Sequence, residues 1–337
     1  MTTMQAARLE AVKSIPTWTS LPVPAPGPND VRIKVKAAAL NRRDFWITQG
    51  QYPGVEPPHT LGSDGVGTVD SIGTEAVTSV SVGDRVIVNP GLFWGNNDAF
   101  QDAHFEILGV PRDGTLAEHI VVPSENVAAC PKHLTDSEAA ALPLAGVTAY
   151  RALVTRANLQ PGERVLITGL GGGVSSLGAL FARALGAEVW GTSGQDHKLE
   201  FFRETYDIHG FNYHSDTWTK DAKTNAGGFD VILDGTGGAG FKGLLKLLNP
   251  GGRIAFYGGT QGTWPEILPQ HLFYRQLSIV ASTMGSPRDF EGMLNLVTTH
   301  TIRPIVWKTF EASDLGQAFD ALATHSQLGK VVINIPN

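Results

Sequence analysis

The pattern of apolar and polar positions changes character near residue 127. Before that point, apolar and alternating runs occur at 5–10, 31–40, 65–73, 84–90 and 116–123, separated by turns rich in proline and glycine. Such runs and turns are typical of short β-strands. The sequence therefore predicts a small all-β module over residues 1–126, with a short helical turn at 44–50.

One segment of this module, about residues 91–115, has little periodicity. Loops of that length are usually functional or disordered. The segment contains the aromatic residues Phe93, Trp94, Phe100 and Phe105. We therefore expect it to fold over something apolar.

Beyond residue 127, segments with helical period alternate with short apolar runs. This alternation predicts an α/β fold with a doubly wound parallel sheet. The first helical pattern, 135–154, has an N-cap signature at Thr135 or Asp136, and Pro143 can divide it into two helices. The chain ends with a strand, a helix and a strand over residues 305–335.

The most informative stretch is 163–202. A β-type run at 165–168 meets a cluster of glycines, a helical pattern follows as far as Gly186, and a second strand pattern covers 188–192. Glycines let a backbone approach a pyrophosphate, and a helix N-terminus offers N–H groups and partial positive charge. The third glycine of a Gly-x-Gly-x-x-Gly pattern falls on Val174, or on Ser175 if the register slips by one, so the prediction of dinucleotide binding depends on the strand, turn, helix and strand around it. Its candidate contacts are Gly169, Gly171, Gly172, Gly173 and Val174.

The end of the second strand indicates which dinucleotide binds. An NAD site places an acidic residue there for the ribose 2′-hydroxyl, whereas this chain has Ser193 followed by Lys198. Ser193 can donate to a 2′-phosphate and Lys198 can pair with its charge, which favours NADP(H). In the alternative interpretation, Lys198 is a solvated helix lysine and Asp196 binds the ribose.

Composition narrows the class of protein. The chain has 337 residues and a net charge of −6, without a basic patch, which argues against nucleic acid as a partner. No apolar run reaches the roughly 18 residues of a membrane span, so a soluble cytoplasmic protein without a membrane partner is expected. The single cysteine, Cys130, excludes an intramolecular disulfide framework and a cysteine-rich zinc lobe.

Five features together resemble one family. They are an Asn-x-x-Asp element at 41–44, LPLAGVTAYRAL, the glycine stretch, NPGGRIAFYGG and LGKVVINI. They are similar to the medium-chain dehydrogenase/reductase superfamily, and most of all to its zinc-free branch of quinone oxidoreductases and enoyl reductases. The resemblance implies a GroES-like catalytic domain, residues 1–126 and 300–337, a Rossmann NADP(H)-binding domain, residues 127–299, and an active site in the cleft between them.

The resemblance also bears on a metal. The positions of the family's three usual zinc ligands are occupied by Asn41, Ser63 and Leu144, and leucine cannot bind a metal. The segment where a structural zinc would be held, 91–115, has no cysteine. Scattered acidic and histidine residues are more often solvated or turn-forming than ligating, so no functional metal site is expected at Asp44, Asp64, His59 or His104.

Without a Lewis acid, the chemistry is expected to be reduction of an activated C=C bond, as in an enone or enoyl thioester, or of a quinone. Tyr52 matches a tyrosine that serves as proton donor in enoyl thioester reductases, although it could also only pack. Asn41 can donate its amide to the carbonyl or nicotinamide, or can cap a loop. Trp46 stands where a tyrosine is common, which suggests an apolar wall.

For the cofactor, the resemblance implies contacts by Thr148, Tyr213, Thr236 and Gly258, each of which also has a plain turn or strand-end interpretation. Lys330 could approach the cofactor phosphates or lie on the surface, and His119 is expected to be structural. The apolar strand 277–283 is expected to pair across a two-fold axis and form a homodimer.

The sequence therefore predicts an NADPH-dependent reductase. A zinc-independent carbonyl or alcohol oxidoreductase and a non-catalytic NADPH-binding protein remain as alternatives.

Overall fold

The computed structural model describes residues 2–324 and 326–336, and the chain forms two compact units. Unit 1 comprises Met1–Ala145 and Gly285–Asn337, and unit 2 comprises Gly146–Met284. The boundaries expected from the sequence, 126/127 and 299/300, assigned two further segments to the second domain. The structure places them in unit 1 because α2 (Asp136–Ala140) packs on strands of that unit, and because Arg288 pairs with Asp98 at 3.5 Å.

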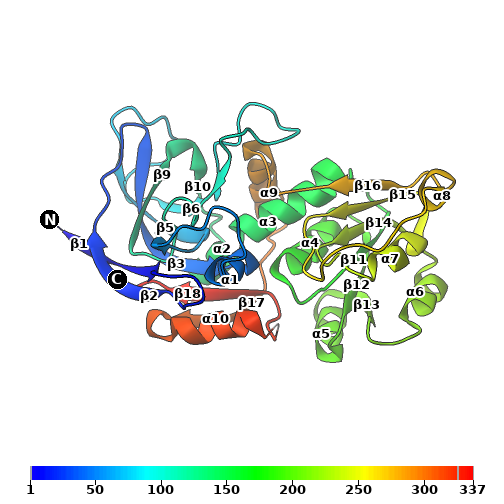
Figure 1. Cartoon of the computed structure of the whole chain (residues 1–337). Coiled ribbons are helices and arrows are strands. Elements are labelled where there is room, and N and C mark those ends of the chain that lie inside the picture. The colour runs from blue at the N-terminus through cyan, green and yellow to red at the C-terminus, as the bar shows by residue number, and fades with distance from the viewer. Residues whose placement is uncertain (1, 325, 337) are drawn as a thin grey trace. The chain divides into compact units, whose positions relative to one another are not determined.

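Unit 1 is built on antiparallel β-structure (Figure 1). One sheet has the order β2-β1-β4, and a larger one has the order β10-β6-β5-β3-β18-β17, with β9 also pairing with β3. Alternate residues of β3, such as Val31, Ile33 and Val35, are buried in the core, as the period of two predicts. The strands are β1 (Thr3–Leu9), β2 (Thr17–Pro22), β3 (Asp30–Leu40), β4 (His59–Thr60), β5 (Asp64–Ile72), β6 (Arg85–Val88), β7 (Gly91–Leu92), β8 (Glu106–Ile107), β9 (His119–Pro123), β10 (Val127–Ala129), β17 (Val306–Glu311) and β18 (Lys330–Asn334).

The last strand of the chain lies beside the third. β18 pairs antiparallel with β3, and Val331 is opposite Leu40 in this register. Lys330 at the start of β18 is therefore brought next to Asn41, which follows β3 directly.

Helices complete unit 1: α1 (Arg42–Thr48), η1 (Ser124–Asn126), α2, α9 (Pro287–Thr299), η3 (Ala312–Asp314) and α10 (Leu315–Ala323).

The 91–115 segment folds partly as expected. It begins with β7, which pairs with β8 in a small hairpin-like sheet. Trp94 is 2% exposed and meets Phe105 edge to face at 5.2 Å between ring centroids. Phe93 packs against the core, but Phe100 is 62% exposed. The segment therefore folds over an apolar surface, as expected, but Phe100 takes no part in it.

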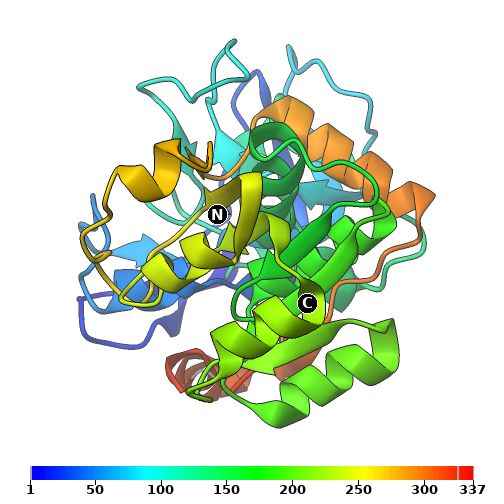
Figure 2. The same ribbon diagram turned by 90° about the vertical axis from the view of Figure 1, so that its right-hand side faces the viewer.

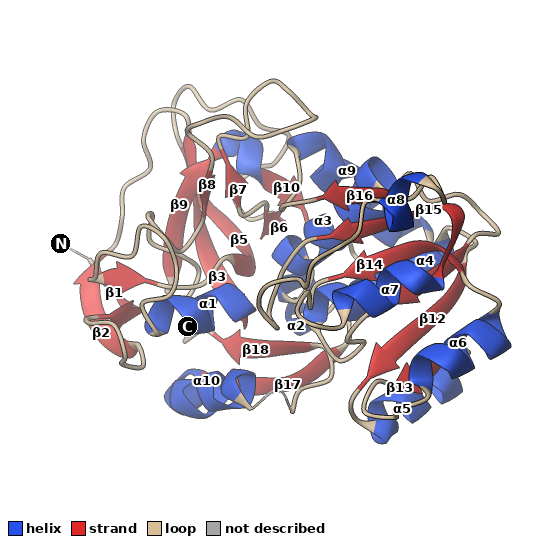
Figure 3. Ribbon diagram, turned by 45° about the vertical axis from the view of Figure 1, so that its right-hand side comes forward, coloured by secondary structure: helices blue, strands red, loops and turns tan. Residues whose placement is uncertain are grey.

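Unit 2 contains a parallel sheet with the order β13-β12-β11-β14-β15-β16 and helices on both faces (Figures 2 and 3). This is the doubly wound arrangement that the sequence predicts. Its strands are β11 (Arg164–Ile167), β12 (Glu188–Ser193), β13 (His209–Asn212), β14 (Phe229–Asp234), β15 (Leu248–Phe256) and β16 (Ser278–Ala281). Its helices are α4 (Gly173–Ala184), α5 (Asp196–Tyr206), α6 (Trp218–Ala226), α7 (Phe241–Leu247) and α8 (Gln270–Phe273).

The helical pattern at 135–154 forms two helices. Thr135 caps α2 and accepts a hydrogen bond from the Glu138 N–H, which confirms the capping box. α3 (Pro143–Tyr150) starts at the proline and continues as a π-helix, η2 (Arg151–Arg156). Among the described residues, the structure has no helix with the length and apolar character needed to span a bilayer.

Candidate active site

A buried group of polar residues lies in unit 1 where β3, β5 and β18 meet. We call it the polar cluster: Asn41, Asp44, Asp64 and Lys330. All four side chains are less than 9% exposed, and Asp44 and Asp64 are fully buried. The Asn41 amide donates from Nδ2 to Asp64 Oδ2 at 2.8 Å. The Lys330 ammonium donates to Asn41 Oδ1 at 2.5 Å and to Asp64 Oδ2 at 2.8 Å.

Backbone groups complete the hydrogen bonding of the two carboxylates. The Leu144 N–H, in the first turn of α3, donates to Asp64 Oδ1 at 2.7 Å. Asp44 accepts from the N–H of Asn41 at 2.7 Å and from the N–H of Gly62 at 3.2 Å. Burial raises the pKa of Asp44 above its usual range, and the nearby Arg43 guanidinium opposes this shift. Each buried carboxylate therefore has donors on both of its oxygens.

Arg43 connects helix α1 to the 91–115 segment. Its guanidinium donates to Ser63 Oγ at 2.6 Å and to the Leu108 carbonyl at 2.7 Å, with a longer contact of 3.4 Å to the Val110 carbonyl. The same guanidinium lies over the Tyr52 ring, 4.8 Å from its centroid. This geometry is typical of a cation–π contact. Arg43 thus fixes both the segment and the ring of a predicted catalytic residue.

The residues at the positions of the family's three usual zinc ligands, 41, 63 and 144, do not fit zinc. Asn41 is hydrogen-bonded to Asp64 and Lys330, and the Ser63 hydroxyl donates to the Leu108 carbonyl at 2.7 Å while it accepts from Arg43. Leu144 contributes only its backbone N–H. Zinc in proteins binds cysteine, histidine or carboxylate, and among the described residues no group of three or more such side chains is placed to hold a metal. The buried ammonium of Lys330 adds repulsion for a cation.

The residues predicted to contact the substrate lie in or next to helix α1. Asn41 is the N-cap of α1, Trp46 is a half-buried residue within it, and Tyr52 follows it, partly buried against the β-rich core. The Asn41 side chain bonds to Asp64 and Lys330, and is thereby joined to residues far along the chain. Lys330 is 4% exposed, so the interpretation of a surface lysine was wrong. Arg43 was not predicted as a site residue. Lys330 was considered only for the cofactor phosphates, and its contacts with Asn41 and Asp64 were missed because these residues lie far from it in the sequence.

The glycine stretch of unit 2 forms the predicted turn between β11 and α4. Gly169 follows the strand with φ +66°, and Gly172 is the N-cap of α4. A Cβ added at Gly169 would have as its nearest neighbour only Thr236 Cγ2, 3.8 Å away, so the space over the turn is open. A turn of this shape before a helix N-terminus fits a pyrophosphate. Gly171, Gly173 and Val174 lie in the same turn and the start of the helix.

A second hydrogen-bond network lies next to the glycine turn, at the ends of β11 and β14. Buried Asp234, the last residue of β14, accepts from the Thr168 hydroxyl at 2.7 Å and from the Thr236 hydroxyl at 2.6 Å. Ser175 donates to the Thr168 carbonyl and lies 3.0 Å from the Tyr257 hydroxyl. Burial raises the pKa of Tyr257 to about 12, so this hydroxyl stays protonated. The sequence placed Thr236 at a strand end but gave no signal for the network.

Three predicted cofactor residues lie near the ends of neighbouring strands. Ser193 ends β12, Lys198 is in the first turn of α5, and Tyr213 follows β13. The Ser193 hydroxyl accepts from the Gln195 N–H at 3.2 Å, and a Cβ added at Gly194 would lie 2.7 Å from the Tyr213 hydroxyl. Lys198 is 5% exposed, and burial lowers the pKa of its ammonium. The interpretation of Lys198 as a solvated lysine was therefore wrong.

The remaining predicted cofactor residues occupy ordinary positions. Thr148 is buried in α3, and Gly258 follows β15 beside Gly235. Of the exposed carboxylates near β12, Asp196 accepts from the Asn212 amide at 2.7 Å. The expectation for His119 was a structural role, and it lies at the start of β9.

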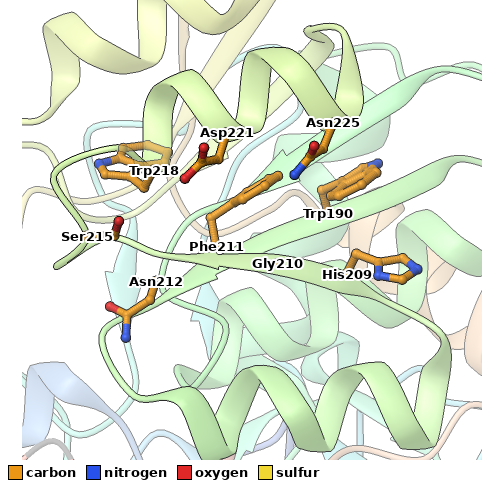
Figure 4. Close-up of a pocket in the computed structure, with 9 residues that line it drawn as sticks. All are labelled: Trp190, His209, Gly210, Phe211, Asn212, Ser215, Trp218, Asp221 and Asn225. Carbon is orange, nitrogen blue, oxygen red and sulfur yellow. The ribbon is translucent and has the colours of Figure 1, made fainter.

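An open pocket of about 490 Å³ lies on unit 2, between the surface of β12 and β13 and helix α6 (Figure 4). Trp190 and Phe211 stack in it with ring planes 5° apart. None of the predicted cofactor residues lines this pocket, whose walls are Trp190, His209, Gly210, Phe211, Asn212, Ser215, Trp218, Asp221 and Asn225. It is thus distinct from the glycine turn.

Comparison with known proteins agrees with this architecture. Residues 27–132 match the alcohol dehydrogenase GroES-like domain, and residues 173–299 match the zinc-binding dehydrogenase domain. A zinc-type alcohol dehydrogenase-like protein, YogA, from Leptosphaeria maculans is 35% identical, over 93% of this chain and 92% of its own. An acryloyl-coenzyme A reductase from Metallosphaera sedula is 30% identical, over 92% of this chain and 93% of its own.

A solved structure of an NAD-dependent alcohol dehydrogenase superposes with a TM-score of 0.91 at 35% identity, covering 99% of this chain and 100% of the other. The predicted fold class, a GroES-like domain with a Rossmann domain, is confirmed. A dehydrogenase or reductase of this kind uses a nicotinamide cofactor, and the glycine turn of unit 2 fits one. The chain belongs to the medium-chain dehydrogenase/reductase superfamily and is an oxidoreductase.

Proposed function

We propose that the protein is an NADPH-dependent reductase of activated C=C bonds, such as those of enones and enoyl thioesters, or of quinones, and that it acts without zinc. One observation carries the proposal: the position of a usual zinc ligand of the family is held by Asn41, a hydrogen-bond donor of the polar cluster. A zinc site cannot be formed by Asn41, Ser63 and Leu144. A buried ion pair between Lys330 and Asp64 lies beside Asn41.

The donor set fits reduction of a conjugated acceptor better than oxidation of an alcohol. Alcohol oxidation at neutral pH needs stabilisation of an alkoxide, to which a Lewis-acid metal contributes several kcal/mol. In conjugate reduction the negative charge spreads onto a carbonyl oxygen as an enolate. Preorganised hydrogen-bond donors can stabilise that oxygen by about 3 kcal/mol each.

The reaction assigns a role to each unit. Bound NADPH would supply the hydride that adds to the β-carbon of the acceptor. The Asn41 amide donates a hydrogen bond to the carbonyl oxygen on which charge develops. The Tyr52 hydroxyl supplies the proton that completes the saturated product, while Arg43 holds its ring.

Unit 2 supports the choice of NADPH. The Tyr213 hydroxyl lies close to Gly194, which follows Ser193 directly, and Lys198 supplies a positive charge that can pair with a phosphate. We therefore propose that Ser193, Lys198 and Tyr213 bind the 2′-phosphate end, while Thr148 and Gly258 contact the nicotinamide end. The acryloyl-coenzyme A reductase among the relatives supports an enoyl thioester as acceptor.

The test is NADPH oxidation by purified, chelator-treated protein with quinones, enones, enoyl thioesters and aldehydes, with metal content measured in parallel. We expect turnover of conjugated acceptors by metal-free protein, and weaker activity with NADH. Activity on alcohols or aldehydes only, or only after zinc is added, would contradict the proposal. Tight NADPH binding without turnover of any acceptor would indicate a binding protein.

We also propose a homodimer formed along β16. This strand is at the edge of the parallel sheet, and Leu268, Phe273 and Tyr274 nearby are 53%, 66% and 85% exposed. An open edge beside apolar side chains is suited to pairing with a second copy. Light scattering should give twice the mass of the chain, 36.0 kDa, and a monomer mass would refute the proposal.

A further inference from the structure

The Asn41 amide has its orientation fixed by two charged neighbours. Its oxygen accepts from the Lys330 ammonium, and its nitrogen donates to the Asp64 carboxylate. An amide turned by 180° would place NH₂ against an ammonium, which has no acceptor, and oxygen against a carboxylate, which has no donor. Only one orientation therefore satisfies all three groups.

In this orientation, one of the two hydrogens on Asn41 Nδ2 forms a hydrogen bond within the polar cluster, and the other points elsewhere. The used hydrogen points to Asp64 Oδ2, and among residues 2–324 and 326–336 no acceptor is recorded for the other. The Asn41 side chain is 7% exposed, so little water competes for that hydrogen. It is available to a substrate oxygen.

The ammonium also strengthens this donor. Hydrogen bonds in a chain polarise one another, and a cation on the oxygen of an amide draws electron density from its nitrogen. The Lys330 ammonium, 2.5 Å from Asn41 Oδ1, lies in a region where water screens the charge little. The remaining N–H of Asn41 is therefore a stronger donor than that of a solvated asparagine.

Asp64 makes this arrangement possible. It is the counterion of Lys330, and it is also held through its other oxygen by the Leu144 N–H. The charge of Lys330 is thus fixed in place by a carboxylate that is anchored to the backbone of α3.

We propose that Lys330 is a positioning residue that acts through Asn41: its ammonium orients and polarises the Asn41 amide, and so replaces the fixed positive charge that zinc supplies in metal-binding relatives. The role in turnover rests on the proposed function above. The orientation and polarisation of the amide do not, and they can be measured without a substrate.

The experiment compares charge-balanced variants, because Lys330→Met alone leaves a buried carboxylate without its counterion and can prevent folding. Lys330→Met combined with Asp64→Asn removes both charges and keeps a side chain of similar size at each position. The NADPH dissociation constant is measured by fluorescence titration, and kcat and KM with the best conjugated acceptor by NADPH oxidation.

We expect kcat of the double variant to fall at least tenfold, with the NADPH dissociation constant unchanged. Asn41→Ala in the wild-type background should lower kcat by about a hundredfold, as loss of one preorganised donor does. Asn41→Ala added to the double variant should cost much less than that, because the two changes remove the same interaction. Equal costs in both backgrounds would overturn the proposal. So would a raised NADPH dissociation constant with unchanged kcat, which would assign Lys330 to the cofactor phosphates.

A spectroscopic measurement separates this proposal from the proposed function. In ¹H–¹⁵N spectra, the Asn41 NH₂ pair, assigned by its loss in Asn41→Ala, should have an unusual shift and slow exchange that both disappear in the double variant. Unchanged Asn41 signals would overturn the positioning role. If wild-type protein turned over no acceptor while the Asn41 signals responded as expected, the proposed function would fail and the coupling of Lys330 to Asn41 would stand.

Discussion

The two candidate sites, one in each unit, are assembled in opposite ways. In unit 2 the glycine turn, the capped helix and the second strand follow one another within residues 163–202, and they form the site in that order. In unit 1 the polar cluster joins Asn41 to Lys330, which is 289 residues later in the chain. The first site is encoded locally, and the second depends on the pairing of β18 with β3.

This difference predicts different responses to mutation. A local turn is held by its own backbone, so one substitution within it should have a limited effect. The polar cluster holds two buried carboxylates and the buried ammonium of Lys330, so removal of one charge of the Lys330–Asp64 pair leaves the other without its partner. The changes below test this contrast, from the largest expected effect to the smallest.

Asp64→Ala should be the most damaging change. It removes the acceptor for Asn41, Lys330 and the Leu144 N–H and leaves a buried ammonium, which should lower the free energy of unfolding by about 3–5 kcal/mol. Urea denaturation of both proteins measures this difference. Asp98→Ala, which removes a half-exposed partner of Arg288, is the control and should change stability little. Equal stabilities of the two variants would show that the cluster is not a structural unit.

Tyr52→Phe should affect turnover more than stability. The ring, and with it the contact to Arg43, remains, but the proton donor is lost. General acid catalysis contributes roughly a hundredfold or more, so kcat should fall by about that factor, with the NADPH dissociation constant unchanged. Tyr206→Phe removes the hydroxyl of the tyrosine that ends α5 and is the matched control. Undiminished kcat in Tyr52→Phe would exclude Tyr52 as the proton donor.

Lys198→Met should weaken NADPH binding about tenfold, equivalent to about 1.4 kcal/mol, and leave NADH binding unchanged. The reason is that only NADPH carries the 2′-phosphate that we assign to Lys198. Fluorescence titration with both nucleotides tests this, with the exposed Lys220→Met as control. A parallel loss of affinity for both nucleotides would remove Lys198 from the specificity site.

Gly169→Ala should have the smallest effect. A methyl group there has room, so the cost is the backbone strain of an alanine at φ +66°, about 1 kcal/mol of unfolding free energy. Gly240→Ala is the control, because Gly240 has φ −70° and open space around it. Thermal unfolding should separate the two variants. A loss in Gly169→Ala as large as that in Asp64→Ala would remove the contrast between the two sites.

The same contrast explains what the sequence could reveal. Strand and helix periods predicted both folds, and the residues at 41, 63 and 144 predicted that zinc ligands are missing. The ion pair of Lys330 with Asp64 could not be found in this way, because no pattern within a window of 40 residues contains both. The burial of Lys198 was missed for a similar reason, since helical period alone does not show which lysine faces the sheet.

Arg43 has a practical consequence for engineering the 91–115 segment. It binds the 91–115 segment through the carbonyl groups of Leu108 and Val110, which every amino acid possesses. Side chains at the tip of the segment, such as the exposed Phe100, take no part in that attachment. A library that randomises the tip and leaves Arg43, Ser63 and the backbone near 108–110 intact should therefore yield folded proteins.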